Sequence, residues 1–182
     1  MRKYRKMFRR CYLILVVFLF SLFNANVRAT EQGPTPDLRL NIISAAYNDL
    51  SRIFSDKKGE MSDPDLKLVD QMDAMLGGPP DAIFELAQSV YFFSACRAEN
   101  CGEKAAIIID MDTKRMLGGA WRHFHCREKP APQIKCDREP TVTIYYFKEL
   151  RKKNELRSKI KDKLEKWGRE VGRKYEEEVE LN

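Results

Sequence analysis

The sequence predicts an α+β domain, because helical patterns come first, strand patterns follow, and a charged helical pattern closes the chain. Apolar residues recur every three or four positions over 38–54 and 64–76, which is typical of amphipathic helices. Two later segments, 105–111 and 141–147, are rich in β-branched and aromatic residues and predict strands. Residues 148–182 combine many charges with a thin apolar stripe. This order favours helices packed on a β-sheet.

The net charge of +6 comes from the first 29 residues. These contain seven basic side chains and no acidic one, and from residue 30 onward 26 basic residues stand against 27 acidic ones. The nearly neutral remainder argues against a nucleic-acid-binding protein. The 153 residues that follow residue 29 are enough for one domain with a real core. We expect this domain at 30–147 and a charged helix after it.

Residues 1–29 have the pattern of a secretory signal peptide. Six basic residues precede residue 11, an apolar run follows over Cys11–Phe23, and Val27-Arg28-Ala29 ends in a small residue. As a helix this run spans about 20 Å, less than the ~30 Å hydrocarbon core of a bilayer. Cleavage after Ala29 is therefore expected, with an uncleaved anchor as the alternative. In either case the rest of the chain is exported to the periplasm or secreted, and it meets a membrane only through this segment.

The second helix has clear expected boundaries, whereas the segment after it is ambiguous. Ser62 or Asp63 is expected to cap helix 64–76, and the run Gly-Gly-Pro-Pro that follows is expected to stop it. Residues 81–93 keep helical spacing at first and then become rich in aromatic residues. We expect a short helix or turn there, giving way to a strand near residue 89.

Strand patterns dominate the middle of the chain. Residues 105–111 are apolar on both faces, which predicts a central strand. Met116–Cys126 is expected to form the return strand, with Ala120 and Trp121 on opposite faces. The pair Gly118-Gly119 indicates a bulge or a close approach of another segment.

Residues 148–182 are expected to form a charged amphipathic helix. The favoured interpretation is that its thin apolar stripe packs on the domain, and the alternative is that it binds a partner or the cell envelope. The stripe consists of Ile160, Leu164, Trp167, Val171 and Tyr175.

The cysteines indicate disulfides. Four remain after residue 30, an even number that suits an oxidising compartment. They allow three pairings, and the spacing favours Cys96–Cys101 and Cys126–Cys136. A metal site built from the second pair with His123 and His125 is the alternative, but the spacing matches no common zinc pattern. We therefore expect no metal.

The sequence shows no motif of a catalytic site. It contains no nucleophile elbow, phosphate-binding glycine loop, His-Glu-x-x-His or EF-hand loop. We assign no catalytic residue and no cofactor, and expect a protein that is not an enzyme. A six-residue ring closed by Cys96 and Cys101 would instead give a stiff protruding loop, which suits insertion into a partner's cleft. A stapled turn without a partner is the alternative.

Residues 90–125 resemble the Ivy-type family, the periplasmic inhibitors of vertebrate lysozyme. The shared elements are Ser94-Ala95-Cys96, Cys101-Gly102, the apolar strand 105–110, and Met116 with Gly118. The resemblance implies a sheet of about five antiparallel strands with helices packed against it. It also implies that the disulfide-closed loop enters the active-site cleft of a lysozyme.

The chain departs from the family inside this loop. The inhibitors carry Lys-Pro-His-Asp between the two cysteines, and the His and Asp do most of the inhibiting. Here the residues are Arg97, Ala98, Glu99 and Asn100, so that Glu99 stands where the His would be. A lysozyme cleft presents two catalytic carboxylates. Placing Glu99 among them would cost about 1–3 kcal/mol.

Two functions from different classes follow. In the first, the chain binds a cell-wall glycosidase, either a lysozyme or a lytic transglycosylase, through Arg97, Ala98, Glu99 and Asn100. In the second, it is a non-catalytic envelope scaffold that uses the helix 148–182 to bind its partner. The expected partner is a protein in both cases, not a nucleic acid, and a homodimer is left open.

Overall fold

The structure is a computed structural model that describes residues 36–59, 61–128, 134–147, 154–172 and 175–181. The expected signal peptide at 1–29 lies outside the described residues. Three helices and eight strands are described in this part of the chain. In chain order they are α2 (Pro36–Phe54), α3 (Leu68–Ala74), β1 (Pro80–Ala87), β2 (Val90–Arg97), β3 (Asn100–Asp110), β4 (Arg115–His123), β5 (Cys126–Glu128), β6 (Ile134–Cys136), β7 (Thr141–Phe147), α4 (Asn154–Val171) and β8 (Tyr175–Leu181).

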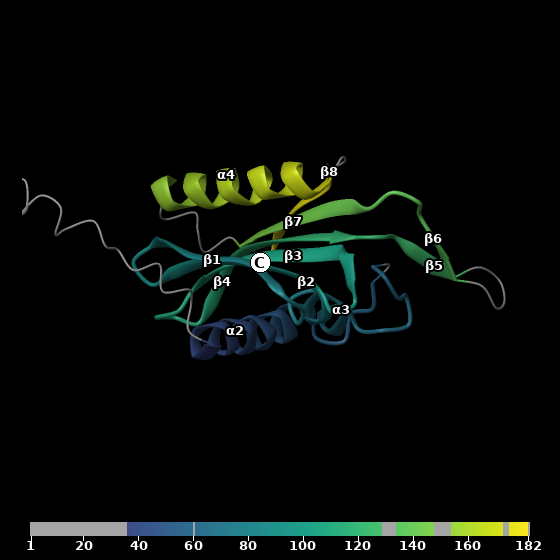
Figure 1. The fold of residues 1–182 in the computed structure, drawn as a ribbon, viewed down its shortest axis with the longest axis horizontal. Helices are drawn as coiled ribbons and strands as arrows, with labels where there is room; N and C mark the ends of the chain where they lie inside the picture. Colours follow the sequence, from purple (N-terminus) through teal and green to yellow (C-terminus); the bar gives the residue numbers. More distant parts are fainter. Residues whose placement is uncertain (1–35, 60, 129–133, 148–153, 173–174, 182) are drawn as a thin grey trace, which may run out of the picture. The chain divides into compact units, whose positions relative to one another are not determined.

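The strands form one large sheet and one small hairpin (Figure 1). The large sheet has the order β1-β2-β3-β4-β7-β8, and β5 pairs with β6 alone. All neighbours from β1 to β7 are antiparallel, whereas β8 runs parallel to β7. The predicted α+β class with five antiparallel strands is thus confirmed, and β8 is an addition to it.

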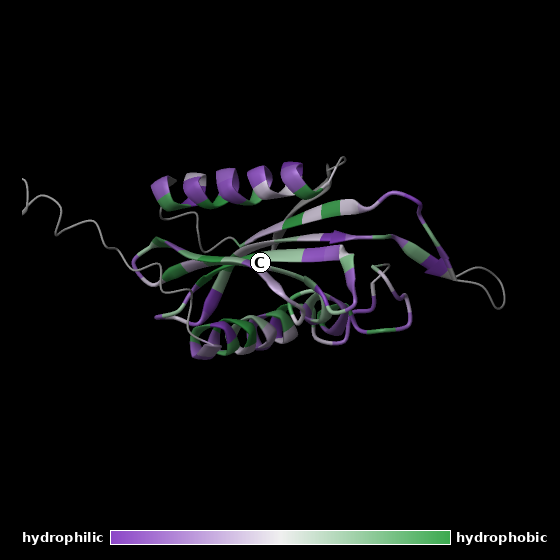
Figure 2. Cartoon of the chain, viewed as in Figure 1, coloured by the Kyte–Doolittle hydropathy of each residue, from purple (hydrophilic) through white to green (hydrophobic). Residues whose placement is uncertain are grey.

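Helices cover both faces of the large sheet. Because side chains alternate along a strand, Ile107 and Ile109 of β3 pack on α2 and α3, while Ala106 and Ile108 belong to the cluster under α4. All four side chains are fully buried. Figure 2 shows the hydrophobic residues of α2 and α4 turned toward the strands. The predicted central strand with two apolar faces is therefore confirmed.

Helix α3 is shorter than the predicted helix 64–76. It begins at Leu68, after Lys67 in extended conformation, and not after Ser62 or Asp63. The Asp63 carboxylate accepts the N–H of Asp65 at 2.9 Å, which forms a local turn, and Gln71 Oε1 accepts the N–H of Asp63 at 2.9 Å. These hydrogen bonds replace the first helical turn, because Asp competes well for nearby backbone groups.

The expected helix or turn after residue 81 is wrong, because this segment is the edge strand β1. It pairs with β2, where Phe84 lies opposite Phe92 and Ile83 opposite Phe93. The rings of Phe84 and Phe92 stack with centroids 4.9 Å apart. Pairing with the aromatic edge of β2 outweighs the helical spacing, as tertiary contacts commonly do.

The pair Gly118-Gly119 marks close approaches, as expected. A Cβ atom on Gly118 would lie 2.9 Å from Leu164 Cδ1 of α4, and one on Gly119 would overlap the Trp121 ring. A register shift falls beside them, because Ile109 pairs with Met116 and Ile108 with Gly118. The two glycines let α4 and Trp121 pack on opposite faces of β4.

The predicted helix 148–182 is too long, because α4 ends at Val171 and residues 175–181 form β8. Gly172 closes α4 with a 2.8 Å bond from its N–H to Gly168 O. A Cβ atom on Gly172 would overlap Val142 of β7, so the chain leaves the helix directly against the sheet. The alternation of Val179 and Leu181 with glutamates is the strand signal that the helical stripe concealed.

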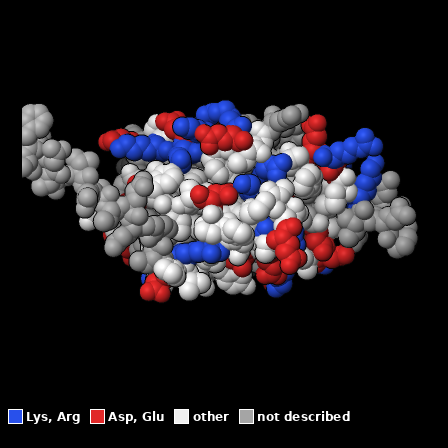
Figure 3. Space-filling view, viewed as in Figure 1, with Lys and Arg blue, Asp and Glu red and all other residues white. Residues whose placement is uncertain are grey.

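The apolar stripe of α4 packs on the sheet, which agrees with the favoured interpretation. Ile160 and Leu164 are fully buried and Trp167 nearly so. The outer side of α4 mixes Lys and Arg with Asp and Glu at the top of Figure 3. None of the described helices has the length and hydropathy needed to cross a membrane.

Candidate functional site: the Cys96–Cys101 loop

The loop between β2 and β3 is a two-residue turn with a large bulge beside it. Arg97 pairs with Asn100, so Ala98 and Glu99 form the turn. The next pair along is Cys96 with Lys104, which leaves residues 101–103 of β3 without a counterpart on β2. This bulge places Cys101 close enough to bond with Cys96.

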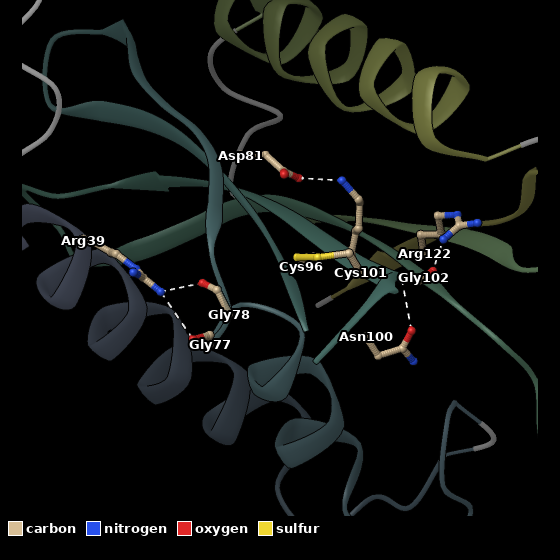
Figure 4. Close-up of a disulfide and its surroundings, with 10 residues drawn as sticks. Arg39, Gly77, Gly78, Asp81, Cys96, Asn100, Cys101, Gly102 and Arg122 are labelled. Atoms are coloured by element: carbon tan, nitrogen blue, oxygen red, sulfur yellow. Dashed lines mark hydrogen bonds and ion pairs between the residues drawn. A yellow bond between two sulfur atoms is a disulfide. The ribbon is translucent and has the colours of Figure 1, made fainter. Parts of the chain in front are cut away.

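The disulfide Cys96–Cys101 closes the loop, as the spacing favoured (Figure 4). The two Cα atoms lie 4.8 Å apart. Cys96 is buried and Cys101 exposed, so the bond ties the tip of the loop to the core. Residues 97–103 lie outside the ladders with the neighbouring strands, because β1 first pairs with β2 at Ala95 and β4 pairs with β3 no further than Lys104.

A buried carboxylate holds the loop from within. Arg97 Nη1 donates to Glu103 Oε2 at 2.9 Å, and Asn100 Nδ2 donates to the same oxygen at 3.2 Å. The Glu103 side chain is only 3% exposed, whereas that of Arg97 is 33% exposed. Removing Arg97 would leave the buried Glu103 carboxylate without its charged partner, at a cost of about 1–3 kcal/mol or more. Arg97 is therefore committed to the loop's own structure.

The bulge is fixed by two further hydrogen bonds. Asn100 Oδ1 accepts the N–H of Gly102 at 3.1 Å. From the neighbouring strand β4, Arg122 Nη1 donates to the carbonyl oxygen of Gly102 (Figure 4). Burial holds the pKa of the Arg122 guanidinium below its ordinary value, and the charge of Glu103 acts in the opposite direction. A guanidinium nevertheless remains protonated at neutral pH, so Arg122 is a charged support of the bulge.

The turn before β1 supports the loop from behind. A Cβ atom on Gly78 would overlap the carbonyl oxygen of Cys96 and lie 2.7 Å from the backbone nitrogen of Ala98. Arg39 of α2 holds this turn in place by donating from Nη2 to Gly78 O at 2.5 Å and to Gly77 O at 3.3 Å. The loop thus rests on a backbone segment that is itself bound to α2 (Figure 4).

Replacing Gly78 with alanine is expected to displace the loop and to lower the free energy of unfolding by about 1–3 kcal/mol, the usual cost of overpacking. Gly77→Ala is the matched control, because its Cβ would meet Ala74 O at an ordinary 3.7 Å. Denaturant unfolding measures the free energy, and amide chemical shifts of residues 96–101 report the displacement. Equal effects of the two substitutions would contradict this support.

The structure separates the four loop residues that the sequence grouped together. Ala98 and Glu99 are exposed at the turn, and Glu99 has a positive φ of 64°. Arg97 and Asn100 instead bind Glu103. Sequence reasoning did not identify Glu103, which resembles any solvated glutamate between two strands. It also passed over Gly78 as a loop residue, because its contact lies with a segment about twenty positions away in the chain.

The two cysteines of the alternative metal site are bonded to each other. Cys126 and Cys136 pair across the β5–β6 hairpin and form the second disulfide. His123 Nε2 lies 2.9 Å from Thr143 Oγ1 in the core. In the part of the chain that the structure describes, no cluster of three or more His, Cys, Asp or Glu could hold a metal ion.

One comparison with known proteins finds a match over the segment that carries this loop. Residues 64–135 match the family model described as "Inhibitor of vertebrate lysozyme (Ivy)". The match confirms the resemblance and extends it from α3 to the β5–β6 hairpin, with the disulfide loop near its middle. No curated protein and no solved structure matches the chain. The two disulfides also suit an extracytoplasmic protein.

Proposed function

We propose that the chain is an exported, non-catalytic protein that binds a cell-wall glycosidase, a lysozyme or a lytic transglycosylase, by inserting the Cys96–Cys101 loop into its cleft. The observation that carries this proposal is the construction of the loop. Its tip is exposed, while the disulfide, Glu103 and Gly78 hold its base. A loop held in one conformation before binding loses little entropy in the complex.

The match to an inhibitor family supports the same function. It covers the loop and both strands that carry it. The signal-like residues 1–29 and the two disulfides support export to a compartment where such enzymes act.

The proposal is tested by enlarging the tip. Ala98→Arg is expected to weaken inhibition of the target by about tenfold or more, because a long side chain at the exposed two-residue turn would clash with the walls of a cleft. Thr113→Arg is the matched control, since Thr113 is exposed in the turn at the opposite end of β3. Peptidoglycan hydrolysis by vertebrate lysozyme and by a bacterial lytic transglycosylase, each mixed with the purified chain, gives the readout.

Two results would contradict the proposal. If the native chain inhibits neither enzyme and binds neither, the loop has another role. If it inhibits one of them and both substitutions leave the inhibition unchanged, the contact lies elsewhere on the protein.

The scaffold function remains the second candidate and now depends on the outer side of α4. The apolar stripe is occupied by the sheet, so a partner would have to recognise exposed charges such as Lys159, Lys166 and Arg169. Two of these three cations already pair with glutamates of the same helix, Lys159 with Glu155 and Arg169 with Glu165. Nothing in this surface favours it over the loop.

A further inference from the structure

The tip of the loop offers a partner one charged group, the carboxylate of Glu99. Arg97, the other charged residue between the two cysteines, is bound to Glu103. The Asn100 side chain is also engaged, with Glu103 and with the N–H of Gly102. Glu99 makes no hydrogen bond or ion pair with any residue that the structure describes, so its carboxylate is available for recognition.

The backbone of the loop restricts the position of the Glu99 carboxylate. Glu99 sits in a two-residue turn with a φ of 64°, and the disulfide closes the ring around it. Behind the turn, the backbone at Gly78 blocks retreat toward the core. A cleft that receives the tip therefore has to receive a negative charge.

The nearby charges do not neutralise Glu99. Lys104 lies 3.0 Å from Asp81, and the Arg97 charge is balanced by Glu103. Arg39 and Arg122 are directed to backbone carbonyl groups at the base of the loop. The tip itself thus keeps one uncompensated negative charge.

Resting on the function proposed above, we infer that the partner's cleft presents a cationic side chain, lysine or arginine, to Glu99. The same carboxylate lowers the affinity of the loop for clefts lined by two carboxylates, such as that of vertebrate lysozyme. Opposite charges attract strongly where water is excluded, and like charges repel there. Glu99 is in this view the residue that determines which glycosidase is bound.

The test uses two forms of vertebrate lysozyme as probes, the native enzyme and a variant whose ionised catalytic aspartate is replaced by lysine. The purified chain is expected to bind the lysine variant about tenfold or more tightly than native lysozyme. Glu99→Gln keeps the shape of the side chain and removes its charge, so it should bring the ratio of the two dissociation constants close to one. Glu155→Gln on α4, where the side chain is 85% exposed, is the control that should leave the ratio unchanged.

The outcomes distinguish this inference from the proposed function. If the native chain binds both lysozymes with equal affinity, the loop enters the cleft but Glu99 does not select it, and the inference is overturned alone. If Glu99→Gln keeps the tenfold preference, the inference is overturned as well. If the native chain binds neither form of lysozyme and also fails to bind the bacterial lytic transglycosylase, the proposed function fails and the inference fails with it. If it binds the transglycosylase but not the lysine variant of lysozyme, the inference alone is overturned.

Discussion

Replacing Asp49 with alanine is expected to lower the free energy of unfolding by about 1–3 kcal/mol, because it leaves the buried N–H of Met116 without an acceptor. Asp49 is 5% exposed and joins α2 to β4. Its Oδ2 accepts the N–H of Met116 at 2.9 Å. Its Oδ1 lies 3.0 Å from Arg115 Nε and 3.0 Å from Arg52 Nη2.

The matched control for Asp49 is Arg52→Ala. The Arg52 side chain is 51% exposed, so losing its ion pair should cost no more than about 1 kcal/mol. Equilibrium unfolding in urea, with the disulfides intact, measures both variants. Comparable losses for the two would show that the hydrogen bond to Met116 and the burial of Asp49 contribute little.

Replacing Leu164 with alanine is expected to cost about 2–5 kcal/mol, the range for a leucine removed from a well-packed core. Leu164 is fully buried in the cluster between α4 and the sheet, and it faces Gly118 at the close approach of the helix to β4. Lys166→Ala, on the exposed side of the same helix, is the control and should change the free energy by no more than about 0.5 kcal/mol. Thermal or urea unfolding gives the readout, and equal effects would mean that α4 does not pack on the sheet.

This second result also determines how the scaffold function can be tested. Deleting residues 148–182 would uncover Ile108, Ile144 and the other apolar side chains under α4. Loss of partner binding after such a deletion would therefore report unfolding as readily as a lost interface. Charge reversal at exposed positions, Lys166→Glu with Arg169→Glu, leaves the core intact and isolates the contribution of the surface.

The disulfide loop illustrates how far sequence reasoning reaches at the site. The short Cys-x4-Cys spacing identified the ring, and the strand pattern after it placed the ring at the end of a hairpin. The sequence did not show which side chains of the ring are available to a partner. The side chains of Arg97 and Asn100 bind the buried carboxylate of Glu103. Glu103 lies in the three-residue bulge of β3, and no local sequence pattern predicts this bulge.

The edges of the sheet illustrate the same limit at the level of the fold. The sequence predicted the inner strands β3 and β7, because a strand that is buried on one or both faces has a strongly apolar sequence. The edge strand β1 buries less, and both β1 and β8 carry charged residues, so a helical spacing fitted them equally well. Their conformation depends on pairing with β2 and β7.

The sequence by itself determined the α+β class, the central strands and the first helix, because each depends on spacing between residues close in the chain. For the same reason it favoured, among three possible pairings, the two disulfides that the structure contains. Only the tertiary structure decided that β1 and β8 join the sheet and that α4 covers its second face. It also decided that Glu99, and not Arg97, is the charge offered at the tip of the loop. These features depend on groups brought together from distant positions, and their burial and pairing appear only when the chain is folded.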